Sequence, residues 1–489
     1  VYGGEKDAII AKFDPNGKLL MSTYLGGPGL DFVRSHANDP SDHIVILGRT
    51  ASLTNIASAG AHKETFSGEN DAFISKFKPD GTLLWSTYFG GNGDEQPYSL
   101  VIDKESNIYI AGLTTSTTQI STDNIVHQPL YGGGLFDSFI AKYDPNGKLL
   151  WSTYFGGTGA DYALGLDIDQ AGDLIVVGTT YSTTKITTPD ALERYYKGNG
   201  DGFVAKFSTD GKLIYASYFG GTSTDELFRC HVDKENNLYA SGYTLSKNLS
   251  TDGTIYQNKE DVLLVKFNSS GKELWATYLG GNDYDHGLGI DTDKNNNPVL
   301  SGLTKSSNFF ITENNIQDIF KGIYDGFFAK YTSDGELLWA TYFGGSGDDR
   351  AGSVIIDKEG SIYGTVNVQS PELATSGAFQ TVSNGFSGFL IKIKEVETVS
   401  LVELEELDPF ILYPNPADTE INLHLHEYDS DSDLKLLDHM GKVIWKMQMK
   451  NDNQILNIDL TDQKFVNGFY FIQATKDGQG ITKRFVILK

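Results

Sequence analysis

One phrase recurs through most of the chain and constrains the fold more than any other feature. It reads DAFISKFKPDGTLLWSTYFGG at residues 71–91. The same phrase opens at Asp7, Asp137, Asp201, Asp261 and Asp325, and a truncated copy opens at Ser387. Successive copies are 64, 66, 64, 60, 64 and 62 residues apart. A period of this size is typical of a stacked or circular array of one supersecondary unit.

Each repeat unit contains four strand-like runs, which we number in chain order. In one unit they are residues 99–103, 107–114, 137–143 and 149–155. Asp, Asn, Gly and Ser bound each run, and these residues tolerate tight turns. Side-chain type alternates with a period of two, which indicates strands. Four strands per unit predict a β-propeller, whose closed ring protects the strand edges. A parallel β-helix is the alternative, although its coils are usually shorter and lack hairpin turns such as DPNGK at 144–148.

The repeated phrase, continued by VIDKxxNxYxxGLT, resembles the SBBP β-propeller repeat over roughly residues 1–393. The resemblance implies an all-β propeller, usually seven-bladed, and implies no activity. The third strand of the unit occurs seven times and each of the others six times. Six blades could close if residues 19–25 completed the last three-stranded set, whereas seven would need strands before Val1. We favour seven four-stranded blades over six.

The charge balance excludes some partners. The chain has 39 basic and 64 acidic residues, with a formal net charge of −25, so we expect no binding to nucleic acid or to anionic membrane. A single cysteine, Cys230, allows no internal disulfide. We also expect no membrane span, because no segment has 18 or more apolar residues.

The period breaks after residue 393. Residues 394–408 are rich in Glu and predict an acidic linker, and residues 409–489 contain short strand-like runs separated by turns. Such spacing predicts a small Ig-like β-sandwich. An accessory domain that binds sugar or another subunit is one interpretation of this region.

A resemblance gives the other interpretation. Four sequence blocks, in order, resemble the type A C-terminal sorting domain of type IX secretion cargo. The block residues are Tyr413, Pro414, Asn415, Pro416, Ala417, Gly441, Gly468, Phe469, Tyr470, Lys483, Phe485 and Lys489. The resemblance implies export through the periplasm and outer membrane of a Gram-negative bacterium, to the cell surface or the medium. The implied partners are the type IX translocon, its outer-membrane shuttle protein and a sortase-like peptidase.

An acid recurs four residues after the second glycine of each Gly-Gly pair. These acids are Asp31, Glu95, Asp161, Asp225, Asp285 and Asp349. They form a predicted ring on the propeller face that also carries the long loops between second and third strands. Calcium, which takes several carboxylate and carbonyl oxygens, is one candidate ligand, and we predict no other cofactor. We favour the other interpretation, in which each acid caps its own turn or pairs with a neighbour.

Three functions fit these observations. A non-catalytic binding or adhesion protein, with surface polysaccharide as one candidate ligand, is the favoured hypothesis. A structural surface-layer component is the second. A polysaccharide lyase or hydrolase is the third, and it would need non-repeating acids and an Arg or His converging on the loops of one blade. The sequence shows no such convergence and no G-x-S-x-G, H-E-x-x-H or P-loop motif, so we predict no catalytic residue.

Overall fold

The structure is a computed structural model in which all named elements are strands. It describes residues 3–122, 126–257, 259–313, 315–375, 378–382, 385–395, 410–413, 417, 419–425, 433–438, 441–448, 455–462, 464–476, 479–487 and 489. The chain divides into two compact units, Val1–Glu395 and Val396–Lys489.

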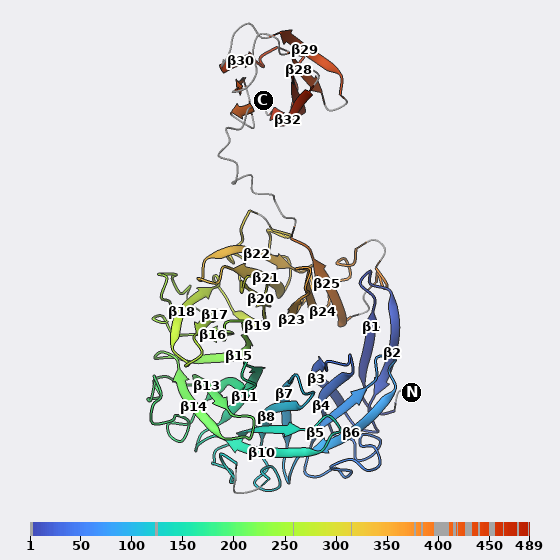
Figure 1. The fold of residues 1–489 in the computed structure, drawn as a ribbon, viewed down its shortest axis with the longest axis vertical. Coiled ribbons are helices and arrows are strands. Elements are labelled where there is room, and N and C mark those ends of the chain that lie inside the picture. Colours follow the sequence, from blue (N-terminus) through green and yellow to red (C-terminus); the bar gives the residue numbers. More distant parts are fainter. Residues whose placement is uncertain are drawn as a thin grey trace. The chain divides into compact units, whose positions relative to one another are not determined.

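The first unit contains five complete blades of four antiparallel strands (Figure 1). The first two blades are β3 (Asp31–Asn38), β4 (Ile44–Thr50), β5 (Asp71–Phe77) and β6 (Leu83–Phe89), then β7 (Glu95–Ile102), β8 (Ile108–Thr114), β9 (Asp137–Tyr143) and β10 (Leu149–Phe155). The third and fourth are β11 (Asp161–Ile168), β12 (Leu174–Thr180), β13 (Asp201–Phe207) and β14 (Leu213–Phe219), then β15 (Asp225–Val232), β16 (Leu238–Thr244), β17 (Asp261–Phe267) and β18 (Glu273–Leu279). The fifth is β19 (Asp285–Thr292), β20 (Pro298–Thr304), β21 (Asp325–Tyr331) and β22 (Leu337–Phe343).

Two partial blades complete the set of seven sheets among the described residues. One contains β1 (Ala8–Phe13) and β2 (Leu19–Leu25), and the other contains β23 (Arg350–Ile356), β24 (Ile362–Val368) and β25 (Ser387–Ile393). Strand β2 pairs with β1 and not with β25, so the six-bladed closure is not formed. The all-β propeller prediction is confirmed, with seven sheets of which two are partial.

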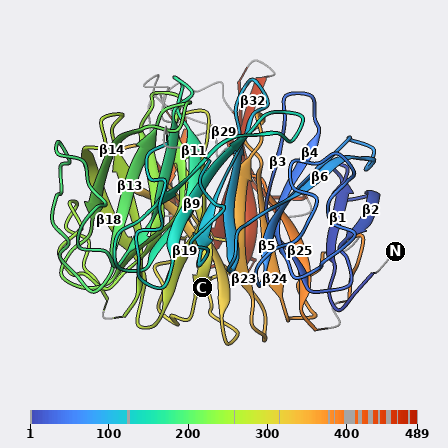
Figure 2. The ribbon, with the colours of Figure 1, turned by 90° about the horizontal axis from the view of Figure 1, so that it is seen from below.

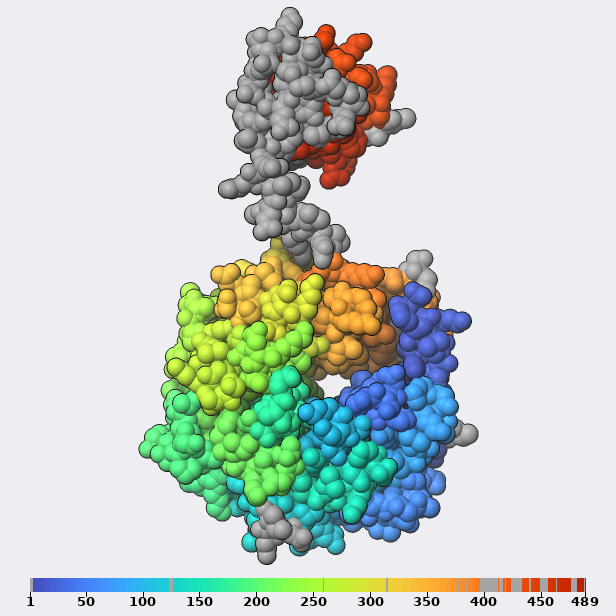
Figure 3. Space-filling view, viewed as in Figure 1, coloured from blue at the N-terminus to red at the C-terminus, as the bar shows by residue number. Residues whose placement is uncertain are grey.

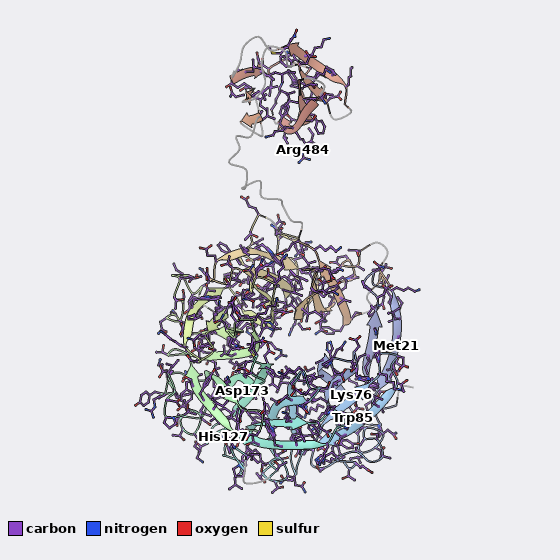
Figure 4. The ribbon with its side chains drawn as sticks, in the orientation of Figure 1. Met21, Lys76, Trp85, His127, Asp173 and Arg484 are labelled. Carbon is purple, nitrogen blue, oxygen red and sulfur yellow. The ribbon has the colours of Figure 1, made fainter. Side chains whose placement is uncertain are left out.

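Adjacent blades are joined by apolar packing and by the repeated lysine and tryptophan. Every residue of β5 is buried, and a single core cluster combines β4 and β5 with β8 and β9 of the next blade. Lys76 and Trp85 (Figure 4) are paired across β5 and β6. Both donate to the Pro145 carbonyl oxygen of the next blade, each at 3.2 Å. The repeated tryptophan and lysine therefore tie successive blades together.

Strand order places the variable loops on one face. The first strands of the blades, β3, β7, β11, β15, β19 and β23, lie around the centre, and the fourth strands lie outside (Figure 1). An opening remains in the middle of the ring (Figure 3). The strands run between two faces of the propeller (Figure 2). Because they alternate in direction, all fourth-to-first and second-to-third connections emerge on the same face, which we call the loop face.

The described residues of the second unit form two antiparallel sheets. Its strands are β26 (Phe410–Tyr413), β27 (Glu420–Leu425), β28 (Asp433–Asp438), β29 (Val443–Gln448), β30 (Ile455–Asp459), β31 (Gly468–Lys476) and β32 (Gln479–Ile487). The sheet orders are β26-β27-β30 and β29-β28-β31-β32. Both sheets contribute to one core, for example through Ile421, Leu434 and Ile472. The Ig-like assignment of this unit stays a prediction.

Candidate functional site

The six predicted acids are buried at the start of the first strands, with at most 2% of their surface exposed. Asp161 accepts hydrogen bonds from the Gly157 N–H at 2.8 Å, the Thr180 hydroxyl at 2.5 Å and the Ser182 hydroxyl at 2.8 Å. The other five acids repeat the glycine and serine contacts. These acids therefore fasten the Gly-Gly turn that enters a blade to the loop that follows its second strand.

A second acid lies beside each of these six acids. It stands at the start of the third strand of the preceding sheet, as Asp137 does for Asp161. A Cβ on Gly156 would lie 2.6 Å from Asp161 Oδ2 and 3.0 Å from Asp137 Oδ1. Gly26, Gly90, Gly220 and Gly280 are crowded in the same way by their own pairs of acids. The first glycine of the repeated pair is therefore required because a side chain there would strike two carboxyl groups.

Burial raises the pKa of several of these carboxyl groups. The pKa of Glu95, Asp137 and Asp285 rises to about 7, and the like charge of the second acid adds to the effect of burial. The Oδ1 atoms of Asp71 and Asp137 are buried and lack a hydrogen-bond partner. In the Asp71–Glu95 and Asp137–Asp161 pairs, a proton on one acid would relieve both the repulsion and the unpaired oxygen.

The donors around the acids suit hydrogen bonding better than calcium. Each pair supplies two carboxyl groups, whereas calcium takes six to eight oxygen ligands. In the part of the chain that the structure describes, no group of three or more His, Cys, Asp or Glu side chains could hold a metal ion. Calcium binding stays a prediction.

The residue after each acid behaves differently, because its type changes from blade to blade. These residues are Phe32, Gln96, Tyr162, Glu226, His286 and Arg350. In each blade, the backbone N–H of the acid donates to the carbonyl oxygen of a residue that directly precedes the third strand of the previous sheet. The residue after the acid therefore lies next to that preceding residue. The preceding residues are Lys6, Asn70, Phe136, Gly200, Glu260 and Tyr324. We call these twelve residues the mouth positions, because they lie where the first strands begin on the loop face.

Four of the six mouth pairs make a direct side-chain contact. Two of these contacts are between a cation and a ring: the Lys6 Nζ lies 5.8 Å from the Phe32 ring centre, and the Arg350 guanidinium lies 4.5 Å from the Tyr324 ring centre. The Phe136 and Tyr162 ring centres are 5.8 Å apart. The Glu260 Oε2 and His286 Nε2 atoms are 2.5 Å apart. The mouth therefore carries a different chemistry at each blade junction.

Glu226 has a glycine as its mouth partner. Gly200 has a φ of +143°, and a Cβ there would lie 3.0 Å from the Tyr181 ring. The Tyr181 side chain takes this space, and the Tyr181 and Tyr243 hydroxyls lie near the Glu226 carboxyl group. Burial and the charge of Glu260 raise the pKa of Glu226, and the two phenol hydroxyls oppose the rise.

The neighbouring blade extends this cluster. The Tyr243 ring stacks on the His286 ring, with centres 4.5 Å apart and an angle of 17° between the planes. His286 in turn contacts Glu260. Glu226, Glu260 and His286 do not repeat, and they come together from two neighbouring blades rather than on the loops of one blade. Comparing the residue after the acid in all copies would have found Glu226 and His286 from the sequence.

Three of the predicted secretion-signal residues meet in the core of the second unit. Ala417, Tyr470 and Phe485 are at most 4% exposed, and the Tyr470 and Phe485 ring centres are 5.8 Å apart. The Ala417 N–H donates to the Val486 carbonyl oxygen at 2.8 Å. Pro414, Asn415 and Pro416 lie outside the described residues, and Tyr413 ends β26.

The remaining signal residues are spread over turns and the surface. Gly441, with a φ of +80°, makes a tight turn by donating to the Asp438 carbonyl oxygen at 2.9 Å. Gly468 begins β31, Lys483 lies on β32, and the Lys489 N–H donates to Asn467 Oδ1 at 2.6 Å. Phe469 is 52% exposed. The guanidinium of Arg484 (Figure 4) lies 5.1 Å from the Phe469 ring centre. Core and surface roles are therefore divided among the signal residues.

The fold and these residues define a β-propeller protein that carries a C-terminal sorting domain. Residues 411–488 match the family described as "Secretion system C-terminal sorting domain", and residues 84–117 match the family described as "Beta-propeller repeat", SBBP. The chain therefore contains an SBBP propeller repeat and a type IX secretion sorting domain.

Two curated proteins are similar over most of this chain. An uncharacterised WD repeat-containing protein of Acanthamoeba polyphaga mimivirus is 25% identical over 442 residues, covering 75% of this chain and 32% of its own length. The regulatory protein FlaEY of Caulobacter vibrioides is 22% identical over 360 residues, covering 68% of this chain and 36% of its own length. The chain thus spans about a third of the length of these relatives.

Among solved structures, PorZ, a surface component of the type IX secretion system of Porphyromonas gingivalis, is 12% identical, with a TM-score of 0.36. The alignment covers 100% of this chain and 57% of PorZ. The described residues contain no helix that is long and apolar enough to cross a membrane.

Proposed function

We propose that this chain is exported by the type IX route and acts at the cell surface or in the medium as a non-catalytic binding protein. The observation that supports it most is the sorting-domain match over residues 411–488, whose core contains three of the signal residues. The propeller then presents a rigid loop face with varied side chains, which is the usual placement of binding residues on a scaffold.

The second unit would be recognised by the translocon and its shuttle protein. Phe469 and Arg484 form an exposed aromatic and cationic pair on β31 and β32. Exposed aromatic and arginine side chains are enriched where proteins bind each other. This pair is therefore the proposed recognition feature, whereas Tyr470 and Phe485 maintain the fold. A sortase-like peptidase remains a proposed later partner.

A binding role suits the mouth better than a catalytic one. Burial raises the pKa of Tyr243 far above its ordinary value, which is opposite to what a nucleophilic phenolate needs. Glu260 is engaged by His286 rather than standing free as a second catalytic acid. A lyase or hydrolase, or a surface-layer component that associates with itself, remains an alternative. Turnover of a glycan by the purified chain, or its self-assembly, would favour one of these.

The export proposal is tested by deleting residues 411–489 and following the propeller in cell fractions. The truncated chain should fold and collect in the periplasm, whereas the full chain reaches the surface or medium. A matched pair separates recognition from folding. Phe469→Ala should reduce export without lowering the melting temperature of the purified chain, and Tyr470→Ala should lower both. Normal export of the deletion variant would contradict the proposal.

A further inference from the structure

The blade junction at Glu226 differs from the other junctions. The mouth position paired with Glu226 is Gly200, which has no side chain to contact the acid. At the next junction along the chain, Glu260 contacts His286 directly. Gly200 provides no side chain for Glu226, and two phenol hydroxyls from different blades approach the carboxyl group instead. We call Tyr181, Glu226, Tyr243, Glu260 and His286 the mouth site.

Aromatic surface in and beside the mouth site is accessible. Tyr181 is 39% exposed and Tyr284, two residues before His286, is 37% exposed. The rings of Tyr243 and His286, which belong to neighbouring blades, stack on each other. Partly exposed rings beside polar groups are what a ligand with both apolar and polar faces requires.

The charges around the site are mixed rather than of one sign. The Lys259 Nζ lies 2.8 Å from Asp283 Oδ1 and 4.8 Å from the Tyr284 ring centre. Lys305 approaches the same ring at 5.8 Å. A cationic ligand would meet these lysines, and an anionic ligand would meet the acids. A neutral ligand rich in hydroxyl groups can donate to carboxylates and accept from phenols and ammonium groups at once.

We propose that the mouth site binds a sugar unit of a neutral polysaccharide. The exposed face of Tyr181 takes the C–H face of the sugar ring, and the carboxylates of Glu226 and Glu260 accept hydrogen bonds from its hydroxyl groups. The phenol of Tyr243 contributes a further polar contact. The inference rests on the proposed binding function and names its ligand class and position. It also gives Gly200 a role, since a side chain there would displace Tyr181.

The experiment is calorimetric titration of the purified full chain with soluble fragments of a neutral glucan, a neutral mannan, a polyuronate and chitosan. The expected result is saturable binding of a neutral glycan. Glu226→Gln and Tyr181→Ala should each weaken it about tenfold or more, because each removes a contact made to the ligand. Tyr181→Phe should retain most of the affinity, because the ring remains.

Tyr195→Ala is the matched control. Tyr195 lies in the same loop as Tyr181 and is 76% exposed, and its removal should leave affinity unchanged. Melting temperatures of all variants identify any that fail to fold. The inference is overturned if no neutral glycan binds, if only the polyuronate or chitosan binds, or if folded Glu226→Gln and Tyr181→Ala bind as tightly as the parent. Normal secretion of the truncated chain would instead contradict the export proposal and leave these titrations unaffected.

Discussion

Two adjacent residues at the start of each first strand have opposite characters. The acid, as at Asp225, recurs in every copy and is buried in hydrogen bonds to a glycine and a serine. The next residue, as at Glu226, differs in every blade and lies at the partly exposed mouth. In this propeller the repeated residues stabilise the fold, because the same packing and hydrogen bonds are needed in every blade. The residues that differ between blades give each blade a different surface chemistry, and a site for a specific ligand needs such differences.

The largest expected effect is loss of a repeated acid. Asp161→Ala leaves the Gly157 N–H and two hydroxyls without their acceptor in a buried place. We expect a loss of about 3 kcal/mol in the free energy of unfolding, and a smaller loss for Asp161→Asn, which keeps one acceptor. Denaturant unfolding measures both. A loss below about 0.5 kcal/mol for the alanine variant would show that the repeat is not structural.

The second effect is an unusual dependence on pH. The folded-state pKa of Glu95, Asp137 and Asp285 is about 7, above the value of about 4 in an unfolded chain. The folded chain therefore holds more protons between about pH 4 and 7, and its stability should fall as pH rises through that window. The melting temperature should be lower at pH 8 than at pH 5, and Asp137→Asn should reduce the difference.

The same series tests the predicted calcium site. Added calcium chloride should raise the melting temperature at pH 8 if the acid pairs bind the ion, and should leave it unchanged if they do not. A melting temperature that does not fall between pH 5 and pH 8 would contradict the protonated pairs.

A third prediction concerns a departure from the repeat deeper in the first strands. His231 Nδ1 lies 3.3 Å from Asp167 Oδ2, and its Nε2 lies 3.5 Å from Asp291 Oδ1, so three blades meet there. Burial lowers the pKa of His231, but the hydrogen bond and charge of Asp167 outweigh it and raise the pKa to about 9. This stabilisation is complete below about pH 6.5 and is lost as pH rises through about 9.

His231→Gln should therefore cost about 1 kcal/mol at pH 6 and much less at pH 10. Urea unfolding at the two pH values measures the difference. An equal loss at both would mean that His231 acts by packing rather than by charge.

The smallest expected effect has the opposite sign. Tyr215 stands where four other blades have tryptophan, and it lines a cavity of about 280 Å³ with Leu192 and Ser269. The equivalent Trp151 donates to the Thr209 carbonyl oxygen of the next blade at 3.0 Å. Tyr215→Trp should fill the cavity and stabilise the chain by about 1 kcal/mol. Destabilisation in thermal unfolding, with Tyr215→Phe unchanged, would show that this junction has a different shape.

Much of the fold could be predicted from the sequence because the same pattern of strands and turns occurs in several copies. The four-strand unit and the Gly-Gly turns both follow from periodicity and turn chemistry. The sorting domain could be recognised because its blocks occur in order. The seven-sheet arrangement needed the structure, because only strand pairing shows that β2 stays with β1.

The candidate site was harder to predict because its residues are distant in sequence and differ between copies. Tyr181, Glu226 and His286 come from three blades and meet only when the ring is formed. The pairing of Asp137 with Asp161 was also hidden, since the two acids open different strands of different blades. A repeated acid attracts attention as a ligand, whereas its burial and hydrogen bonds depend on packing that no single copy reveals.

The most direct test compares Asp225→Ala with Glu226→Gln in one thermal-shift series, with and without the neutral glycan that binds the parent chain. Our account predicts that Asp225→Ala lowers the melting temperature by several degrees and keeps the upward shift on adding glycan. It predicts that Glu226→Gln keeps the melting temperature and loses that shift. The opposite pattern, with Glu226→Gln unstable yet still shifted by glycan, would contradict the division between repeated and varied positions.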